Sequence, residues 1–260
     1  MNRTITKEKA LSVVERYVEQ KQNKNKVFNL FEIIQMRETS HTKFLAWLLD
    51  VKNKDENSLQ YLFMKKFLQE IHFETENLDS FVKLLSEDVI VKSEFSTDIG
   101  SIDIFIYSKN ANFVCVIENK IDAKICISKN GKSQIERYYN FINSKHEYNK
   151  CIQKFVFITR YSNILKESDN KLLNNYQYLV REHSDIAKII DDEVINCCSD
   201  KTISEILKQY KDYWEQNWYD SIDGIWIVEA CNKVRYEYTN SEIQKFPEEI
   251  REILSEKLDN

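Results

Sequence analysis

The residues best suited to chemistry are two carboxylates and a lysine in neighbouring apolar segments. Asp103 lies within the segment Ile102 to Tyr107, and Glu118 directly follows the segment Phe113 to Ile117. If these segments are strands of one hairpin, Asp103 and Glu118 meet at one edge of a sheet. Residues i and i+2 of a strand point to the same face, so Lys120 would lie beside Glu118. The spacing predicts a cluster of two acids and one base.

Such a cluster suits the hydrolysis of phosphodiester bonds. Hard divalent cations such as Mg²⁺ prefer carboxylate, backbone and water oxygens, which Asp103 and Glu118 could supply. A nearby lysine can orient or deprotonate a nucleophilic water and neutralise the charge that develops on a phosphate. The alternative is a solvated sheet edge on which Glu118 and Lys120 form a weak surface pair. Both carboxylates interrupt apolar strands, however, and charges embedded there need partners or a metal.

Hydrophobic periodicity predicts the elements that position this cluster. Alternation from Val89 to Glu94, followed by the two apolar segments, predicts a three-stranded antiparallel meander with a turn at Ser108 to Ala111. A helix from roughly Ser133 to Lys145 and a strand from Phe155 to Thr159 follow. We therefore expect a strand-helix-strand crossover after the meander.

The flanking regions are predicted to be helical. Ser40 to Thr42 would cap a short, deeply buried helix, and Leu59 to Ile71 forms a second amphipathic one. From about Asp185 onward the pattern is helical again, and Pro247 can open the final helix at its first turn.

Composition restricts the classes of protein that remain. The chain has 260 residues with 42% hydrophobic and 12% aromatic content, enough for a folded core. Three Gly and one Pro argue against an all-β fold. The net charge of −5 supplies no general attraction to nucleic acid or to an anionic membrane, so any nucleic-acid contact must be a local patch.

Neither a membrane segment nor a metal-binding cysteine pattern is indicated. No window approaches the roughly 18 to 20 consecutive apolar residues of a membrane span, and the first residues lack a signal-peptide core. A cytoplasmic location is therefore expected. The six cysteines include no CxxC and no His at ligand spacing, so most are expected to be small buried hydrophobes.

Four blocks of the sequence resemble the PD-(D/E)XK nuclease superfamily. Gly100 to Ile104 contains the first acid, Ile117 to Ile121 contains the Glu-Asn-Lys triplet, and Gln134 is followed four positions later by Tyr138. The upstream segment Glu38 to Asp50, ETSHTKFLAWLLD, is similar to a prokaryotic branch of that superfamily. The chain departs from the usual pattern at three positions, none of which removes a catalytic group: Ser101, Ile102 and Val51.

The resemblance implies an α/β fold with a restriction-endonuclease-like core of order α-β-β-β-α-β and a mixed central sheet. We expect one nuclease-like domain over residues 1–260, with its core at approximately 38–160, a helical N-terminal extension at 1–37 and a helical C-terminal region at 185–260. By resemblance, Mg²⁺, for which Mn²⁺ can substitute, would bind Asp103, Glu118, Glu38 and the main-chain carbonyl of Asn119. Lys120 would position the attacking water.

Three further residues are expected to assist. Gln134 and Tyr138 are i, i+4 neighbours on one helix face, and in the superfamily this pair supports the active site or touches the phosphate backbone. Alternatively, they form a polar helix face with Tyr138 half-buried. His41 is expected to cap a helix or support a catalytic residue, because three carboxylates and a lysine already complete the chemistry without a histidine base.

These features predict a Mg²⁺-dependent nuclease acting on DNA, of the kind that bacteria and phages use in defence or nucleic-acid processing. The alternatives are a non-catalytic member of the fold that binds a partner or regulates a complex, and a structural oligomer subunit. The intact set of Asp103, Glu118 and Lys120 argues against a non-catalytic role.

A monomer with a net charge of −5 is expected to bind duplex DNA weakly, so a further source of affinity is needed. Either a homodimer aligns two basic edges, each running from Lys124 to Lys132, or a partner subunit docks on the C-terminal helical region. The aromatic residues expected to anchor a partner there are Tyr210, Tyr213, Trp214, Trp218, Trp226 and Tyr236. The alternative is that these side chains pack internally and the chain is a monomer with a basic cleft.

Overall fold

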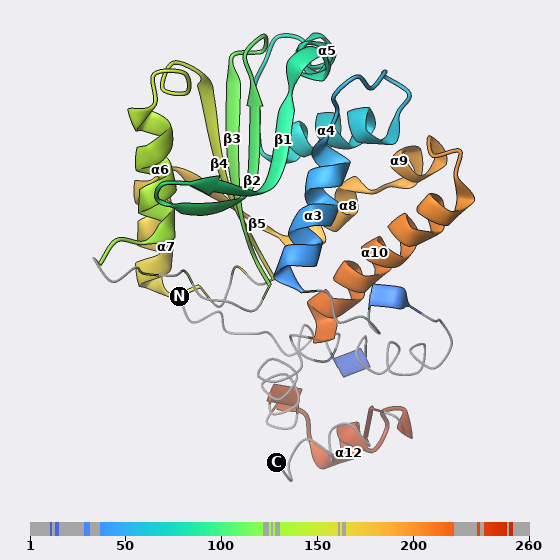
Figure 1. Cartoon of the computed structure of the whole chain (residues 1–260). Helices are drawn as coiled ribbons and strands as arrows, with labels where there is room; N and C mark the ends of the chain where they lie inside the picture. Colours follow the sequence, from blue (N-terminus) through green and yellow to red (C-terminus); the bar gives the residue numbers. More distant parts are fainter. Residues whose placement is uncertain are drawn as a thin grey trace. The chain divides into compact units, whose positions relative to one another are not determined.

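A computed structural model describes residues 37–121, 131–160 and 165–220, together with shorter pieces at 11, 14–15, 29–31, 125, 127, 162, 233–234, 237–248 and 250–251 (Figure 1). The chain divides into two compact units. One comprises Phe31–Trp214, and the other comprises Met1–Leu30 with Glu215–Asn260. All of the sheet lies in the first unit.

The sheet has five strands in the order β1-β2-β3-β4-β5. The first three, β1 (Ile90–Thr97), β2 (Gly100–Ser108) and β3 (Phe113–Lys120), form the predicted antiparallel meander. Two parallel strands, β4 (Ile152–Thr159) and β5 (Tyr178–Glu182), then extend the sheet beyond β3. The mixed sheet and the α-β-β-β-α-β order confirm the expected restriction-endonuclease-like fold.

Helices cover both faces of this sheet (Figure 1). On one face, α6 and α7 pack over an apolar cluster that includes Val114, Val116 and Phe157. On the other face, the cluster containing Cys115 and Ile117 packs against the remaining helices of the unit. The described helices are α3 (Glu38–Leu49), α4 (Leu59–Glu70), α5 (Leu78–Asp88), α6 (Gln134–Ser144), α7 (Glu167–Asn175), α8 (His183–Ile189), α9 (Asp192–Asn196), α10 (Lys201–Asp220) and, in the second unit, α12 (Asn240–Ile243).

The start of α3 differs from the sequence prediction. Ser40 to Thr42 were expected to cap this helix, but α3 begins at Glu38 with Arg37 as its N-cap, so all three residues lie inside it. Glu38 in the first turn is favourable because a negative charge there complements the helix dipole. His41 and Thr42 are buried, so their polar side-chain atoms need hydrogen-bond partners inside the protein.

Polar caps set the starts of the helices that follow. Ser58, Asn77 and Ser133 are the N-caps of α4, α5 and α6, and each side chain accepts a hydrogen bond from the backbone N–H three residues later. The helices α5 and α7 and the strand β5 were not predicted. The end of the chain agrees better, since Ile250 and Arg251 donate helical hydrogen bonds to the carbonyl of Pro247.

Three of the six aromatic residues that were expected to anchor a partner pack inside the protein instead. Tyr210, Tyr213 and Trp214 are buried, and Tyr210 packs against Phe31 and Phe44. For these three residues, the internal-packing alternative holds. The side chain of Trp218 and the residues Trp226 and Tyr236 lie outside the described part of the chain.

The described cysteines are free thiols and are less buried than expected. Cys115 is fully buried, whereas Cys151, Cys197 and Cys198 are only partly covered. Within the described residues, no helix combines the length and the apolar character needed to cross a bilayer.

The β1–β2 hairpin bends sharply beside Asp103. In a flat strand Ile102 and Ile104 would share a face, yet Ile104 packs on the α3 side of the sheet and Ile102 on the α6 side. Glu94 lies opposite Asp103 in the register and has φ 51°, a left-handed conformation rare within strands. Figure 1 shows the outer part of the hairpin reaching across toward α6. We call this part, Phe95 to Ser101, the arm.

Two side chains of α6 hold the arm in place. Arg137 donates a hydrogen bond to the carbonyl of Ile99, and the Tyr138 hydroxyl donates to the carbonyl of Ser101. Phe95 stacks on Phe105 with ring centroids 4.4 Å apart. The arm is therefore fixed against α6 next to the predicted acidic cluster.

This packing predicts that Gly100→Ala is destabilising. Gly100 has φ 135°, and a Cβ there would lie 3.0 Å from Arg137 Nη1. We expect a loss of about 2 to 3 kcal/mol in the free energy of unfolding, since backbone strain adds to the displacement of Arg137. Gly131→Ala is the control, because φ is 80° but nothing lies within 4 Å, so only a backbone cost of about 1 to 2 kcal/mol applies. Equal losses in urea denaturation would show that the arm is loosely packed.

Candidate functional site

The predicted acids and the lysine come together at the end of β3. Ile104 pairs with Ile117, so Asp103 and Glu118 lie next to each other on adjacent strands. Glu118 is 0% exposed, Asp103 is 9% exposed and Lys120 is 5% exposed. The site is thus a buried charge cluster, and the alternative of a solvated sheet edge is wrong.

The ammonium group of Lys120 lies among three carboxylates. Its Nζ is 2.6 Å from Glu118 Oε1, 2.9 Å from Glu38 Oε1 and 3.6 Å from Asp103 Oδ2. Glu38 reaches this position from the first turn of α3, and its Oε2 also accepts a hydrogen bond from the Ile121 N–H at 3.4 Å. One positive charge faces three negative charges, so the cluster is incompletely neutralised.

Burial and this imbalance shift the pKa values of the cluster. Burial raises the pKa of Asp103, although Lys120 and a hydrogen bond from the Asn119 N–H oppose the shift. Burial and the nearby Asp103 raise the pKa of Glu118 well above its usual value. Burial lowers the pKa of Lys120, but the attraction of Glu118 and Asp103 outweighs it and the net shift is upward. The lysine is therefore held protonated and acts as a donor.

The carboxylates fit a divalent cation with few protein ligands. Glu118 Oε2 is buried and has no hydrogen-bond partner within the described residues, which leaves an acceptor for a cation. No group of three or more His, Cys, Asp or Glu in the described ranges is arranged to hold a metal by itself. Mg²⁺ commonly takes only one or two carboxylates and completes its shell with water and substrate phosphate. Asp103 and Glu118 supply such a pair.

The two predicted residues on α6 have different neighbours. Gln134, in the first turn, donates from Nε2 to Glu118 Oε1 and so contacts the acidic cluster directly. Tyr138 is buried, but its hydroxyl is bound to the Ser101 carbonyl, which places it at the arm. The structure thus brings Gln134 to the cluster and Tyr138 to the element beside it.

On the opposite face of β3, the side chain of Asn119 is the centre of a second polar cluster. Its Oδ1 lies 3.0 Å from His41 Nδ1 and 2.8 Å from His183 Nε2. Its Nδ2 donates to the Glu38 carbonyl at 3.3 Å and to Thr42 Oγ1 at 3.0 Å. Every hydrogen-bonding position of this buried amide is used.

His41 is a neutral hydrogen-bonding group in this cluster. Burial lowers its pKa to about 3, although the bond to Asn119 opposes the shift. Its Nε2 lies 2.7 Å from the Tyr210 hydroxyl, so both ring nitrogens are engaged. Burial likewise lowers the pKa of His183 well below its ordinary value. Sequence reasoning missed His183 and this role of Tyr210, and the only available signal was that the chain contains just four histidines.

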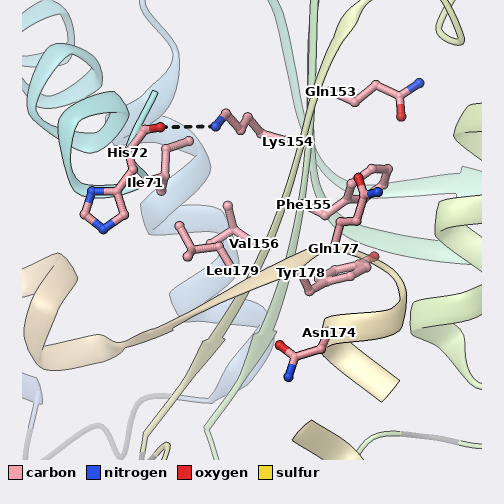
Figure 2. A pocket seen from close by; sticks show the side chains of 10 residues that line it. All are labelled: Ile71, His72, Gln153, Lys154, Phe155, Val156, Asn174, Gln177, Tyr178 and Leu179. Atoms are coloured by element: carbon pink, nitrogen blue, oxygen red, sulfur yellow. Dashed lines mark hydrogen bonds between the residues drawn. The ribbon is translucent and has the colours of Figure 1, made fainter. Parts of the chain in front are cut away.

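A hollow of about 380 Å³ opens elsewhere on the sheet (Figure 2). It is lined by residues of β4 and β5, by the two residues that follow α4, Ile71 and His72, and by the end of α7 with Gln177 after it. Lys154 Nζ donates to the His72 carbonyl oxygen at 3.2 Å. None of the lining residues is acidic, and Lys154 pairs with Cys115 toward the start of β3, whereas Glu118 lies near its end. The hollow is separate from the acidic cluster.

Comparison with known proteins gave one match. A family model described as the PD-(D/E)XK nuclease superfamily matches residues 28–257. No curated protein and no solved structure matches significantly. The matched range includes both polar clusters of β3.

The pKa of His41 predicts a pH-dependent contribution to stability. Between the ordinary pKa of 6.5 and the folded value of about 3, the unfolded chain binds a proton that the folded chain excludes. Stability from neutral His41 is therefore present above pH 6.5 and lost as the pH falls. His41→Asn can still donate to Asn119 but does not titrate, so the advantage of the wild type over this variant should shrink by about 1.4 kcal/mol per pH unit below that point. Urea denaturation of both proteins at several pH values measures the difference in their free energies of unfolding. A difference that does not change with pH would contradict the prediction.

Proposed function

Because this chain belongs to the PD-(D/E)XK nuclease superfamily, we propose that it is a Mg²⁺-dependent nuclease that hydrolyses phosphodiester bonds in DNA. The observation that carries the proposal is the cluster of the buried Asp103, Glu118 and Lys120 with the partly exposed Glu38, in which Glu118 Oε2 is left for a cation. A cluster with this excess of negative charge is costly to bury unless a cation completes it.

In this proposal Asp103, Glu118 and the main-chain carbonyl of Asn119 hold the metal, and Mn²⁺ can replace Mg²⁺. When bound, the ion would neutralise phosphate charge and lower the pKa of a water molecule. Gln134 supports the site by donating a hydrogen bond to Glu118 Oε1. Glu118 Oε2 has no hydrogen-bond partner among the described residues and is the oxygen that would bind the metal. Glu38 either adds a ligand or acts through its ion pair with Lys120.

Lys120 provides a fixed positive charge in the proposed mechanism. Its raised pKa keeps the ammonium protonated, so it orients the attacking water and stabilises negative charge on the phosphate. Because it is bound to Glu118 and Glu38, its position is set before substrate arrives. Removal of the proton from water is therefore not assigned to this residue.

The first prediction is metal-dependent cleavage that requires both acids. Purified protein should cleave plasmid, linear duplex or single-stranded DNA with Mg²⁺ or Mn²⁺ and lose this activity in a chelator. Asp103→Asn and Glu118→Gln should each reduce cleavage at least about 10³-fold and abolish Mg²⁺ binding in calorimetry, because each removes a ligand. Both should fold at least as stably as the wild type, since each removes a buried repulsive charge.

A matched RNA series tests the choice of DNA. Cleavage of RNA alone would contradict the proposed substrate but not the nuclease site. No cleavage of any nucleic acid, together with unchanged Mg²⁺ affinity in both variants, would contradict the proposed function and favour the non-catalytic alternative.

A second prediction separates charge stabilisation from metal binding. Lys120→Ala should retain Mg²⁺ affinity and lose about 10²- to 10³-fold in kcat, because its ammonium contacts the carboxylates without being a ligand. Lys120→Arg should not restore the rate, since a planar guanidinium cannot occupy the same position among three carboxylates. Wild-type kcat in Lys120→Ala would rule out this role.

Two further parts of the proposal rest on sequence arguments. The resemblance of the segment Glu38 to Asp50 to a prokaryotic branch of the superfamily supports a role in defence against phage, which plaque counts on cells expressing wild type or Asp103→Asn would test. The net charge of −5 supports self-association or a partner subunit as a source of DNA affinity, which sedimentation with and without duplex DNA would test. Much of the basic edge, including Lys124 and Lys129, lies outside the described residues.

A further inference from the structure

The backbone of Asn119 lies between the two side chains most important to the proposed site. Glu118 and Lys120 flank it in sequence, and its own N–H donates to Asp103 Oδ2 at 2.8 Å. Any shift or rotation of Asn119 would therefore move one or more of the charged groups. What holds Asn119 in place also determines the geometry of the acidic cluster.

The side chain of Asn119 points away from that cluster and is fully bound by groups from the helices. Since Oδ1 can only accept, His41 must present Nδ1–H and His183 must present Nε2–H. A neutral His41 in this tautomer has Nε2 free to accept the hydroxyl proton of Tyr210. One set of protonation states thus satisfies all of these contacts.

These partners come from separate elements that lie far apart in sequence. His41 and Thr42 lie in α3, His183 begins α8 and Tyr210 lies in α10. The His183 ring is stacked on Trp214 with a centroid distance of 4.1 Å and an interplanar angle of 16°. Apolar packing alone allows helices to slide, whereas directional bonds to the Asn119 amide fix α3 and α8 relative to β3, and the bond from Tyr210 to His41 adds α10.

We propose that His41, Thr42, His183 and Tyr210 are positioning residues that act through the Asn119 side chain to hold Glu118 and Lys120 in their working geometry. This inference rests on the proposed nuclease function. A merely structural role would also explain burial of the network. The two possibilities differ in whether restoring the hydrogen bond restores the site, independently of global stability.

The test compares His183→Gln with His183→Leu. The Gln Nε2 can donate to Asn119 where the His Nε2 did, while Leu fills similar space without a donor. We expect His183→Leu to lower kcat at least tenfold and Mg²⁺ affinity at least threefold, with little change in KM for DNA, because a displaced catalytic group affects the reaction more than the binding of a long substrate. His183→Gln should restore both values to within about threefold of the wild type.

Phe73→Leu is the stability control. Phe73 is buried against Phe81 and Phe113 at the start of β3, at the other end of the strand from the site. The Phe73→Leu variant should have a lower unfolding midpoint than the wild type and the same kcat and Mg²⁺ affinity. The proposal is wrong, and the network is structural only, if His183→Leu loses stability as Phe73→Leu does but keeps wild-type kcat and Mg²⁺ affinity. It is also wrong if His183→Gln folds but does not recover kcat and Mg²⁺ affinity.

A milder pair covers the case in which His183→Leu does not fold. Thr42→Val removes the acceptor of the Asn119 Nδ2 bond at nearly constant volume, and Thr42→Ser keeps it. We expect a threefold or greater loss of Mg²⁺ affinity in the first variant and none in the second. Mg²⁺ calorimetry needs no substrate, so if the wild type cleaves nothing, the nuclease proposal fails while these variants still decide whether Asn119 positions the acidic cluster.

Discussion

The burial of three consecutive polar residues at the end of β3 is the constraint on which the rest of the structure depends. Glu118, Asn119 and Lys120 complete a strand that is buried along its whole length, and each would be costly there without partners. Strand alternation directs Glu118 and Lys120 to one face and Asn119 to the other. Both helical layers must therefore supply polar groups at the same point, and the apolar core has to be built around that requirement.

The two faces meet the requirement in different ways. On the Asn119 face, neutral groups bind every hydrogen-bonding position of the amide, although the buried Nδ1 of His183 has no partner among the described residues. On the Glu118 face, three carboxylates share one ammonium, and the remaining negative charge makes the site receptive to a cation. Glu38 contributes to both, because its carbonyl accepts from Asn119 and its carboxylate binds Lys120. The first turn of α3 thus joins the structural face to the chemical one.

The sequence allowed the acidic cluster to be predicted because its core depends on local geometry. Alternation within a strand and one short hairpin suffice to place Asp103, Glu118 and Lys120 together. The Asn119 network could not be predicted in the same way, because His183 follows a short strand whose pattern was too brief to recognise. The cap assigned to Ser40 to Thr42 failed for a related reason. Polar residues before an apolar run resemble a cap, and only the tertiary structure shows that His41 and Thr42 face a buried amide inside the helix.

The sequence separation within the Asn119 network has a consequence for the newly made chain. Asn119 is 64 residues from His183, and His41 is 169 residues from Tyr210. During translation, the acids and the lysine emerge from the ribosome well before α8 and α10, and contacts of such long range form late because loop closure must precede them. The hydrogen-bond network around Asn119 is therefore incomplete until α10 has been synthesised. A truncated or unfinished chain would carry every residue of the acidic cluster and lack the support that gives the cluster its shape.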